Sequence, residues 1–255
     1  MIHPTAIIHP QAQIGSNCEI GPYCIIGEHV TLGDNCKLHS HVVLEGHTKL
    51  GQGNEIFQFA SIGAKTQDLK WKGGVTRTEI GDRNTFREYV SIHSATSDGG
   101  VTLVGSDNNI LAYNHVAHDC RLGNHIIISN SVALAGHVIV EDHAVIGGVV
   151  GVTQFCRIGR LAMVGSSSKI TQDVPPFMIV DGNPCATRII NKVGLERNGV
   201  SPEAQSALKQ AYKIFFRDEL GGTAALAKIE QEVPLLPEVK YFVQFIRASE
   251  RGVCK

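Results

Sequence analysis

Two histidines and an aspartate lie within five residues, in the segment HVAHDC at 115–120, as His115, His118 and Asp119. An imidazole beside a carboxylate is a typical general base, which removes the proton from an attacking hydroxyl during acyl transfer. The same residue types also bind zinc, and they can simply occupy the polar corners of a repeating scaffold. The elements that position this segment decide among these three interpretations.

An aliphatic residue recurs every six positions over most of the first 170 residues. A helix needs a period of 3.6 and a half-buried strand a period of 2, so neither explains a period of six. One hexad instead fits a short strand and a corner, and three hexads (3 × 6 = 18 residues) close one triangular coil of a parallel β-helix. Every position of the series is Ile, Leu or Val except Phe86: Ile2, Ile8, Ile14, Ile20, Ile26, Leu32, Leu38, Leu44, Leu50, Ile56, Ile62, Ile80, Phe86, Ile92, Val104, Ile110, Val116, Leu122, Ile128, Leu134, Val140, Ile146, Val152, Ile158, Val164 and Ile170.

The bulk composition excludes several classes of protein. The net charge of −1 gives no reason to expect binding to nucleic acid or to a membrane surface. No apolar run is long enough for a membrane span, and no basic region with an apolar run marks a signal peptide, so we expect a cytoplasmic protein. The seven cysteines lack CxxC spacing and are predicted to be thiols packed as small apolar residues.

Two interruptions and a change of pattern divide the chain. Insertions near 64–78 and 94–103 interrupt the hexads, and loops that interrupt a solenoid are often functional. The segment 172–186 closes the repeat with two prolines and a DGNP turn. Beyond it, Ser201 and Pro202 predict a helix start. We therefore expect a β-helix over 1–186 and an α-helical C-terminal domain over 187–255.

The spacing of the coils places the histidine motif next to a glycine. Residues 18 apart lie one coil apart on the same edge, so His118 is about one strand spacing, ~4.8 Å, from Gly136. Gln154 follows one coil further along. A base beside an exposed backbone N–H provides both groups that acyl transfer needs, because the N–H stabilises the oxyanion.

Over about residues 1–175 the hexads resemble the hexapeptide-repeat family. The resemblance implies a left-handed parallel β-helix, which departs from the usual right-handed crossover. It also implies a homotrimer with active sites between subunits. The γ-type carbonic anhydrases share this solenoid and bind zinc through two histidines five apart and a third two coils earlier. Here His115 and His118 are three apart and His93 is about one coil away, so no metal is expected.

Nearly the whole chain also resembles the UDP-N-acetylglucosamine O-acyltransferase family, in segments that include QDLK (67–70), LAGHV (134–138), QFCRIG (154–159) and QDVPPF (172–177). The resemblance implies transfer of an (R)-3-hydroxyacyl group from acyl carrier protein to the 3-position of UDP-N-acetylglucosamine, the first step of lipid A biosynthesis. No cofactor is expected. Another hexapeptide acyltransferase, using a different UDP-sugar such as a 3-amino sugar or using acyl-CoA, is the main alternative, and a non-catalytic scaffold is the third.

The resemblance also suggests roles for single residues. His118 matches the general base, Asp119 the group that orients it, and Gly136 the oxyanion donor. Ser166 matches the position read as an acyl-length ruler. Thr153 stands where the family often has a histidine, and Val193 and Asn198 replace acidic and basic residues, so contacts to sugar or nucleotide are expected to differ. The matching substrate contacts are Gln67, Asp68, Lys70, His115, His137, Thr153, Gln154, Asn191 and Arg197.

Overall fold

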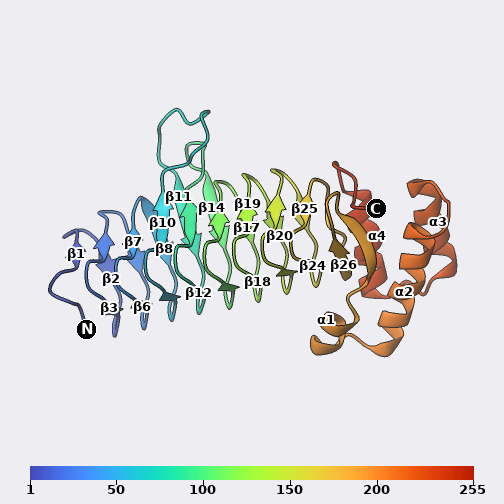
Figure 1. Ribbon diagram of the computed structural model, residues 1–255, viewed down its shortest axis with the longest axis horizontal. Helices are drawn as coiled ribbons and strands as arrows, with labels where there is room; N and C mark the ends of the chain where they lie inside the picture. Colours follow the sequence, from blue (N-terminus) through green and yellow to red (C-terminus); the bar gives the residue numbers. More distant parts are fainter.

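The hexad repeat forms short parallel strands that stack along one long axis (Figure 1). Aliphatic residues one coil apart pair directly: Val116 pairs with Leu134, and Leu134 with Val152. All three are almost completely buried. The inward stacking that the sequence predicts is therefore confirmed in this computed structural model, which describes residues 1–255.

Three sheets form the faces of the solenoid, and we name each after its first strand. The β1 sheet contains β1 (Ile7–Ile8), β4 (Ile25–Ile26), β7 (Val43–Leu44), β10 (Ser61–Ala64), β13 (Ser91–His93), β16 (His115–Val116), β19 (Ala133–Leu134), β22 (Gly151–Val152) and β25 (Lys169–Ile170). The β2 sheet contains β2 (Gln13–Ile14), β5 (Thr31–Leu32), β8 (His47–Leu50), β11 (Arg77–Ile80), β14 (Val101–Val104), β17 (Arg121–Leu122), β20 (Ile139–Val140) and β23 (Arg157–Ile158). The β3 sheet contains β3 (Glu19–Ile20), β6 (Lys37–Leu38), β9 (Glu55–Ile56), β12 (Thr85–Phe86), β15 (Asn109–Ile110), β18 (Ile127–Ile128), β21 (Val145–Ile146), β24 (Met163–Val164), β26 (Met178–Asp181) and β27 (Ala186–Ile190).

The corners turn through single residues in the left-handed region of backbone space. Asp119 and His137, at equivalent corners of successive coils, both have a φ of 61°. Asn, Asp and His adopt this conformation more readily than most side chains. Many of the polar residues that punctuate the hexads therefore serve the backbone, and a functional role for any one of them needs separate evidence.

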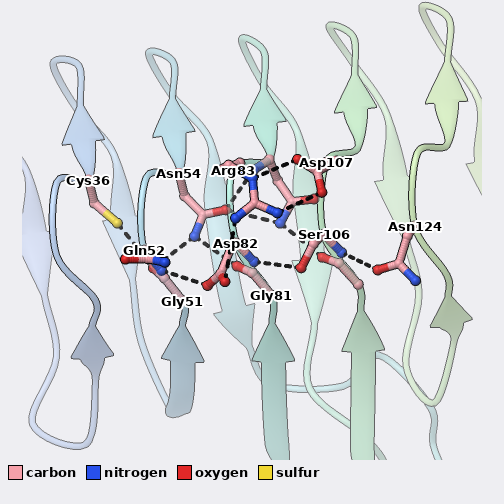
Figure 2. A network of polar contacts seen from close by, with 12 residues as sticks. Cys36, Gly51, Gln52, Asn54, Gly81, Asp82, Arg83, Ser106, Asp107 and Asn124 are labelled. Atoms are coloured by element: carbon pink, nitrogen blue, oxygen red, sulfur yellow. Dashed lines mark hydrogen bonds and ion pairs between the residues drawn. The ribbon is translucent and has the colours of Figure 1, made fainter.

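Buried amides hold the coils together where insertions lengthen them. Asn84 Nδ2 donates to Asn54 Oδ1 across a 30-residue coil, at 3.0 Å, and Asn84 Oδ1 accepts from the backbone N–H of Asn108 across a 24-residue coil, at 3.0 Å. Cys36 occupies the equivalent inner corner of the preceding coil (Figure 2). Since all seven cysteines are buried and free, their predicted packing role is confirmed.

The outer side of the same corner carries a second line of polar contacts (Figure 2). Asp82 Oδ1 accepts from the backbone N–H of Gln52 at 2.9 Å. Ser106 Oγ in turn accepts from the N–H of Asp82, also at 2.9 Å. Arg83 adds two 2.8 Å hydrogen bonds to the Asp107 carboxylate. The register between neighbouring coils is thus held by side chains as well as by the strands.

The two insertions form loops at 65–76, between β10 and β11, and at 94–100, between β13 and β14. They project together from one side of the solenoid (Figure 1). Both loops are shorter than the sequence predicted, because Arg77 pairs with Val101 and Thr78 with Thr102, which extends the strands into the expected insertions. Thr66 and Thr96 share a buried 2.8 Å hydrogen bond that joins the loops.

A β-hairpin lies across the boundary expected at residue 186. After the two prolines, β26 pairs in parallel with β24. The next strand, β27, begins at Ala186 and pairs antiparallel with β26. The hairpin extends the β3 sheet beyond β24, so β27 becomes its edge strand. The division of the chain at 186 stays a prediction, and the strand that crosses it belongs to the sheet.

Four helices cover this end of the solenoid (Figure 1). They are α1 (Lys192–Arg197), α2 (Pro202–Phe216), α3 (Gly222–Glu232) and α4 (Pro237–Arg247). Ser201 Oγ accepts from the Ala204 N–H at 3.1 Å, so the predicted N-cap of α2 is confirmed. Leu208, Phe215 and Phe242 build a second core. No helix in the chain has the length and apolar character that crossing a membrane requires.

Replacing Asn84 by alanine should lower the free energy of unfolding by about 1–3 kcal/mol, because it leaves buried donors and acceptors of three coils without partners. Chemical denaturation followed by circular dichroism measures this. Asn130→Ala is the matched control, since Asn130 is exposed and surface changes usually stay within about 0.5 kcal/mol. Equal effects of the two substitutions would contradict a structural role for the buried amides.

Candidate active site

His118 and Asp119 form a base and its orienting carboxylate at the corner that follows β16. His118 Nδ1 lies 2.8 Å from Asp119 Oδ2. Two further contacts fix Asp119: its Oδ2 accepts from the Thr96 N–H at 3.2 Å, and its own N–H donates to Thr102 Oγ1 at 2.8 Å. A carboxylate acceptor keeps the imidazole proton on Nδ1, so Nε2 is left with a free lone pair that can accept a proton.

Gly136 gives the imidazole of His118 the space that it occupies. A Cβ at residue 136 would lie 2.3 Å from His118 Cε1 and 2.6 Å from Nε2, so only glycine fits. The Gly136 N–H makes no hydrogen bond within the chain. The structure thus places a free imidazole nitrogen beside a free backbone donor, as the 18-residue spacing predicts.

A cavity of about 810 Å³ lies over the outer face of the β1 sheet, beside the 65–76 loop. His118 and Gly136 line it together with most of the sequence-predicted substrate contacts. Two of the titratable lining residues, His93 and Lys169, are absent from that predicted set. The full lining is Gln67, Asp68, Leu69, Lys70, His93, His115, Ala117, His118, Ala133, Leu134, Ala135, Gly136, Gly151, Val152, Thr153, Gln154 and Lys169.

Asp68 approaches the free side of the base. Its Oδ2 lies 3.9 Å from His118 Nε2, while its Oδ1 accepts from the Lys70 N–H at 2.9 Å. The carboxylate is largely buried, at 22% exposed. A substrate hydroxyl between Asp68 and His118 would find an acceptor on either side, so the 65–76 loop helps to define where the attacking group lies.

Two neutral histidines lie on the other side of the base. Burial, reinforced by the imidazoles of His93 and His118, lowers the pKa of His115 to about 4. Burial also lowers the pKa of His93. His115 Nδ1 lies 2.8 Å from Ser91 Oγ, whereas the buried Nδ1 of His93 has no partner. Uncharged imidazoles suit contacts to the neutral hydroxyls of a sugar.

The spacing in the sequence could have identified Lys169 as a lining residue, but it could not have identified His93. Lys169 follows His115, Ala133 and Gly151 in steps of 18 residues, so the same arithmetic that found Gly136 identifies it. His93 belongs to a 24-residue coil, since Ser91 pairs with His115. The insertion interrupts the 18-residue spacing between coils. From the sequence, His93 was considered only as a possible metal ligand.

Four of the sequence-predicted substrate-binding residues lie outside this cavity within the single chain. His137 Nε2 is 3.6 Å from Asp119 Oδ2, and its ring stacks on Phe155. Asn191 is buried and caps α1, where its amide also donates to the Leu161 carbonyl at 2.8 Å. Arg197 is exposed at the end of α1, and Ser166 is exposed between β24 and β25. The structure does not bring these four side chains to the cavity.

One group of side chains has the spacing of a metal site. Ligand atoms of His118, Asp119 and His137 all lie within 4.8 Å of one another. This set differs from the combination of His93, His115 and His118, whose spacing in the sequence argues against a zinc site. The 2.8 Å contact between His118 and Asp119 fits a hydrogen bond and would have to open for a cation to bind both. The absence of a resident metal stays a prediction.

Comparisons with known proteins identify the family. An acyl-[acyl-carrier-protein]–UDP-N-acetylglucosamine O-acyltransferase of Synechocystis is 50% identical over 202 residues, which are 79% of this chain and 73% of that protein. The enzyme of the same name from Anaeromyxobacter is 46% identical over 82% and 81%. This chain belongs to the acyl-[acyl-carrier-protein]–UDP-N-acetylglucosamine O-acyltransferase family. The enzyme class that the sequence predicted is thereby confirmed.

One family model and the solved structures agree with this assignment. A model described as UDP-N-acetylglucosamine O-acyltransferase, domain 2, matches residues 173–254, and one described as the GMPPB C-terminal domain matches residues 2–97 within the repeat. The UDP-N-acetylglucosamine acyltransferase of Bacteroides fragilis superposes with a TM-score of 0.97 at 43% identity, covering 100% of both chains. Its counterpart from Acinetobacter baumannii gives 0.96 at 46%, covering 100% and 99%. The left-handed β-helix expected from the sequence is confirmed.

Replacing Gly136 by alanine should reduce turnover strongly while the chain still folds, because the added methyl group displaces the His118 ring. We expect a loss of about 10²-fold or more, the usual effect of losing a positioned general base. Steady-state kinetics measure it. Gly222→Ala, at a site where a Cβ meets nothing within 4 Å, is the control. A Gly136→Ala enzyme with normal turnover would contradict the close packing of ring and glycine.

Proposed function

We propose that this chain transfers an (R)-3-hydroxyacyl group from acyl carrier protein to the 3-hydroxyl of UDP-N-acetylglucosamine, the first step of lipid A biosynthesis, with His118 as general base. The observation that carries the proposed mechanism is the position of His118, whose ring lies against Gly136 and its free N–H. Both groups line one cavity. The names of the relatives support the donor and the acceptor.

The reaction needs one proton acceptor and one oxyanion donor. His118 Nε2 removes the proton from the sugar hydroxyl as its oxygen attacks the thioester carbonyl. The Gly136 N–H donates to the oxygen on which negative charge develops. When the C–S bond breaks, the imidazolium of His118 returns the proton to the departing thiolate. The acyl group therefore passes directly to the sugar, and no covalent enzyme intermediate forms.

Asp119 stabilises the charged form of the base. Its Oδ2 lies 2.8 Å from His118 Nδ1, so the positive charge that develops on the imidazole is next to a carboxylate. The N–H of Thr96 donates to that carboxylate, and the Thr102 hydroxyl accepts from the backbone N–H of Asp119, so side chain and backbone are both held in place. Since Thr96 belongs to the second insertion, this loop contributes to catalysis through Asp119.

The other lining residues have roles in binding. We assign the sugar to the region around Asp68, His93 and His115, where neutral imidazoles and a carboxylate face the cavity. Gln67, Lys70, Thr153 and Gln154 complete the predicted contacts from this chain. Asn191, Arg197, His137 and Ser166 would act at a cavity shared with a neighbouring chain.

Replacing His118 by alanine should lower kcat by about 10²–10⁴-fold, which is the usual contribution of a general base. The assay follows conversion of UDP-N-acetylglucosamine with 3-hydroxyacyl carrier protein, and His29→Ala, at an exposed corner, is the control. A variant with near-native turnover would exclude His118 as the base. Efficient turnover with acyl-CoA but not with acyl carrier protein would contradict the proposed donor.

We further propose that the active enzyme is a homotrimer. A ridge of exposed aromatic side chains runs along the corner between the β3 and β1 sheets, with Phe59, Tyr89 and Tyr113 stacked at centroid distances of 5.0 Å. These rings are 47–61% exposed, and a contiguous apolar surface of this kind marks an interaction site. A second copy of the chain is the occupant that the family resemblance favours.

Replacing Tyr113 by aspartate should shift the assembly from trimer to monomer, because it buries a charge in the apolar contact. Light scattering after size exclusion measures the mass. His125→Asp is the matched control: it lies at another corner, and its φ of 55° is close to the 63° of Tyr113. A trimer that survives Tyr113→Asp unchanged would show that this ridge is not the interface.

A further inference from the structure

The imidazole of His118 lies between two carboxylates that come from different parts of the chain. Asp119 Oδ2 is 2.8 Å from its Nδ1, and Asp68 Oδ2 is 3.9 Å from its Nε2. Nε2 is the atom that removes the proton from the sugar hydroxyl. The distance between Asp68 and this nitrogen therefore decides whether that hydroxyl fits between the two groups.

The segment that carries Asp68, residues 66–71, is tied to the rest of the protein by a single hydrogen bond. The Asp68 N–H donates to Thr66 Oγ1 at 3.1 Å, and the Lys70 N–H donates to Asp68 Oδ1 at 2.9 Å, so both bonds stay within the segment. The Trp71 N–H likewise donates to the Asp68 carbonyl, at 3.1 Å. The only hydrogen bond that leaves the segment joins Thr66 Oγ1 to Thr96 Oγ1 at 2.8 Å.

Apolar packing does little to replace this tether. Leu69 is fully exposed, and the ring of Trp71 lies 3.8 Å from the Lys65 ammonium group of the same loop. The other half of the loop is anchored separately, because the Val75 N–H donates to Asp98 Oδ1 of the second insertion at 2.8 Å. The half that carries the carboxylate therefore depends on its one outgoing hydrogen bond.

The two threonines of this tether each make a second contact, and these contacts end at the two carboxylates that flank the base. Thr66 Oγ1 accepts from the Asp68 N–H at 3.1 Å, and the Thr96 N–H donates to Asp119 Oδ2 at 3.2 Å. Both threonines are buried, so water competes little for their hydroxyls. The contacts close a ring through His118, Asp119, Thr96, Thr66 and Asp68.

We propose that Thr66 is a positioning residue for acyl transfer, because its hydroxyl fixes Asp68 opposite the free nitrogen of His118. The inference rests on the proposed function and deepens it by naming the group that sets where the acceptor hydroxyl binds. Without this hydroxyl, the Asp68 N–H and the Thr96 hydroxyl both lose their partner. A displacement of ~1 Å at a reaction centre can cost about 10²-fold in rate.

Thr66→Val tests the proposal, since it removes the hydroxyl and nearly keeps the shape of the side chain. In steady-state kinetics of the full-length enzyme, kcat/KM for UDP-N-acetylglucosamine should fall by about tenfold or more. The KM for the acyl carrier protein donor should stay unchanged, because the segment 66–71 faces the sugar. Thr66→Ser keeps the hydroxyl and should retain most of the wild-type activity.

Thr78→Val is the matched control. Thr78 is also buried, in β11, but its hydroxyl has no hydrogen-bond partner. The same substitution there removes no contact, so the kinetics and the melting temperature should stay those of the wild type. The melting temperature of each variant also reports folding, and Thr66→Ala takes the place of Thr66→Val should the valine variant fail to fold.

A double-mutant cycle with Asp68→Ala separates positioning from a general effect on the loop. If Thr66 acts through Asp68, the loss caused by Thr66→Val should shrink to less than about twofold in the Asp68→Ala background, because the two residues then share one effect. Calorimetric titration with UDP-N-acetylglucosamine gives the same comparison from binding affinities, without turnover.

An equal loss in both backgrounds would overturn the inference, since Thr66 would then act independently of Asp68. A Thr66→Ser enzyme as impaired as Thr66→Val would also overturn it, because the hydroxyl would not be the group that matters. A donor KM that rises together with the acceptor KM would do the same. A wild-type enzyme that does not acylate UDP-N-acetylglucosamine would instead contradict the proposed function, and that result appears before any substitution.

Discussion

The register between neighbouring coils is the constraint on which the rest of this structure depends. Each coil hydrogen-bonds to the next through its strands, and the inward aliphatic residues stack on one another, as Val116, Leu134 and Val152 do. A slip of one residue would turn every inward side chain outwards, so the core admits one alignment. The same alignment fixes the corners. The His137 N–H donates to the His118 carbonyl at 3.1 Å, and the Phe155 N–H donates to the Gly136 carbonyl at 3.1 Å.

The chemistry arises where the repeat is interrupted. A regular solenoid places His118 beside Asp119 and Gly136, but it supplies nothing to hold the Asp119 carboxylate or to face the free nitrogen of the base. The first insertion brings Asp68 to 3.9 Å from Nε2, and the second supplies the Thr96 N–H that fixes Asp119. The hydrogen bond between Thr66 and Thr96 couples the two loops. The solenoid thus positions the base. The two loops fix its orienting carboxylate and define where the substrate hydroxyl lies.

Much of the fold and the centre of the site could be predicted because both follow from regular residue spacing in the sequence. The period of six gives the strands, and the 18-residue step gives the pair His118 and Gly136. The same step leads to Lys169, although its position becomes meaningful only once the cavity is known. His93 was not predicted as a lining residue, because the insertion lengthens its coil to 24 residues and local spacing no longer reports which side chains are neighbours.

Other features depend on contacts that no local pattern records. The approach of Asp68 to the base depends on the conformation of the 65–76 loop, and β27 depends on an antiparallel pairing with β26 that lies outside the hexad repeat. Asn191, Arg197 and Ser166 were assigned through the family resemblance alone. Within one chain their surroundings are a helix cap, an exposed helix end and an exposed corner, so their roles depend on an assembly that sequence spacing does not encode.

A crystal structure of the enzyme with a bound tetrahedral analogue of the acyl-transfer intermediate tests the central claim most directly. If coil stacking creates the reaction centre, the oxyanion of the analogue should lie within about 2.7–3.1 Å of the Gly136 nitrogen. The oxygen that stands for the sugar hydroxyl should lie within hydrogen-bonding distance of His118 Nε2. An analogue bound with both oxygens remote from these two groups would contradict the account.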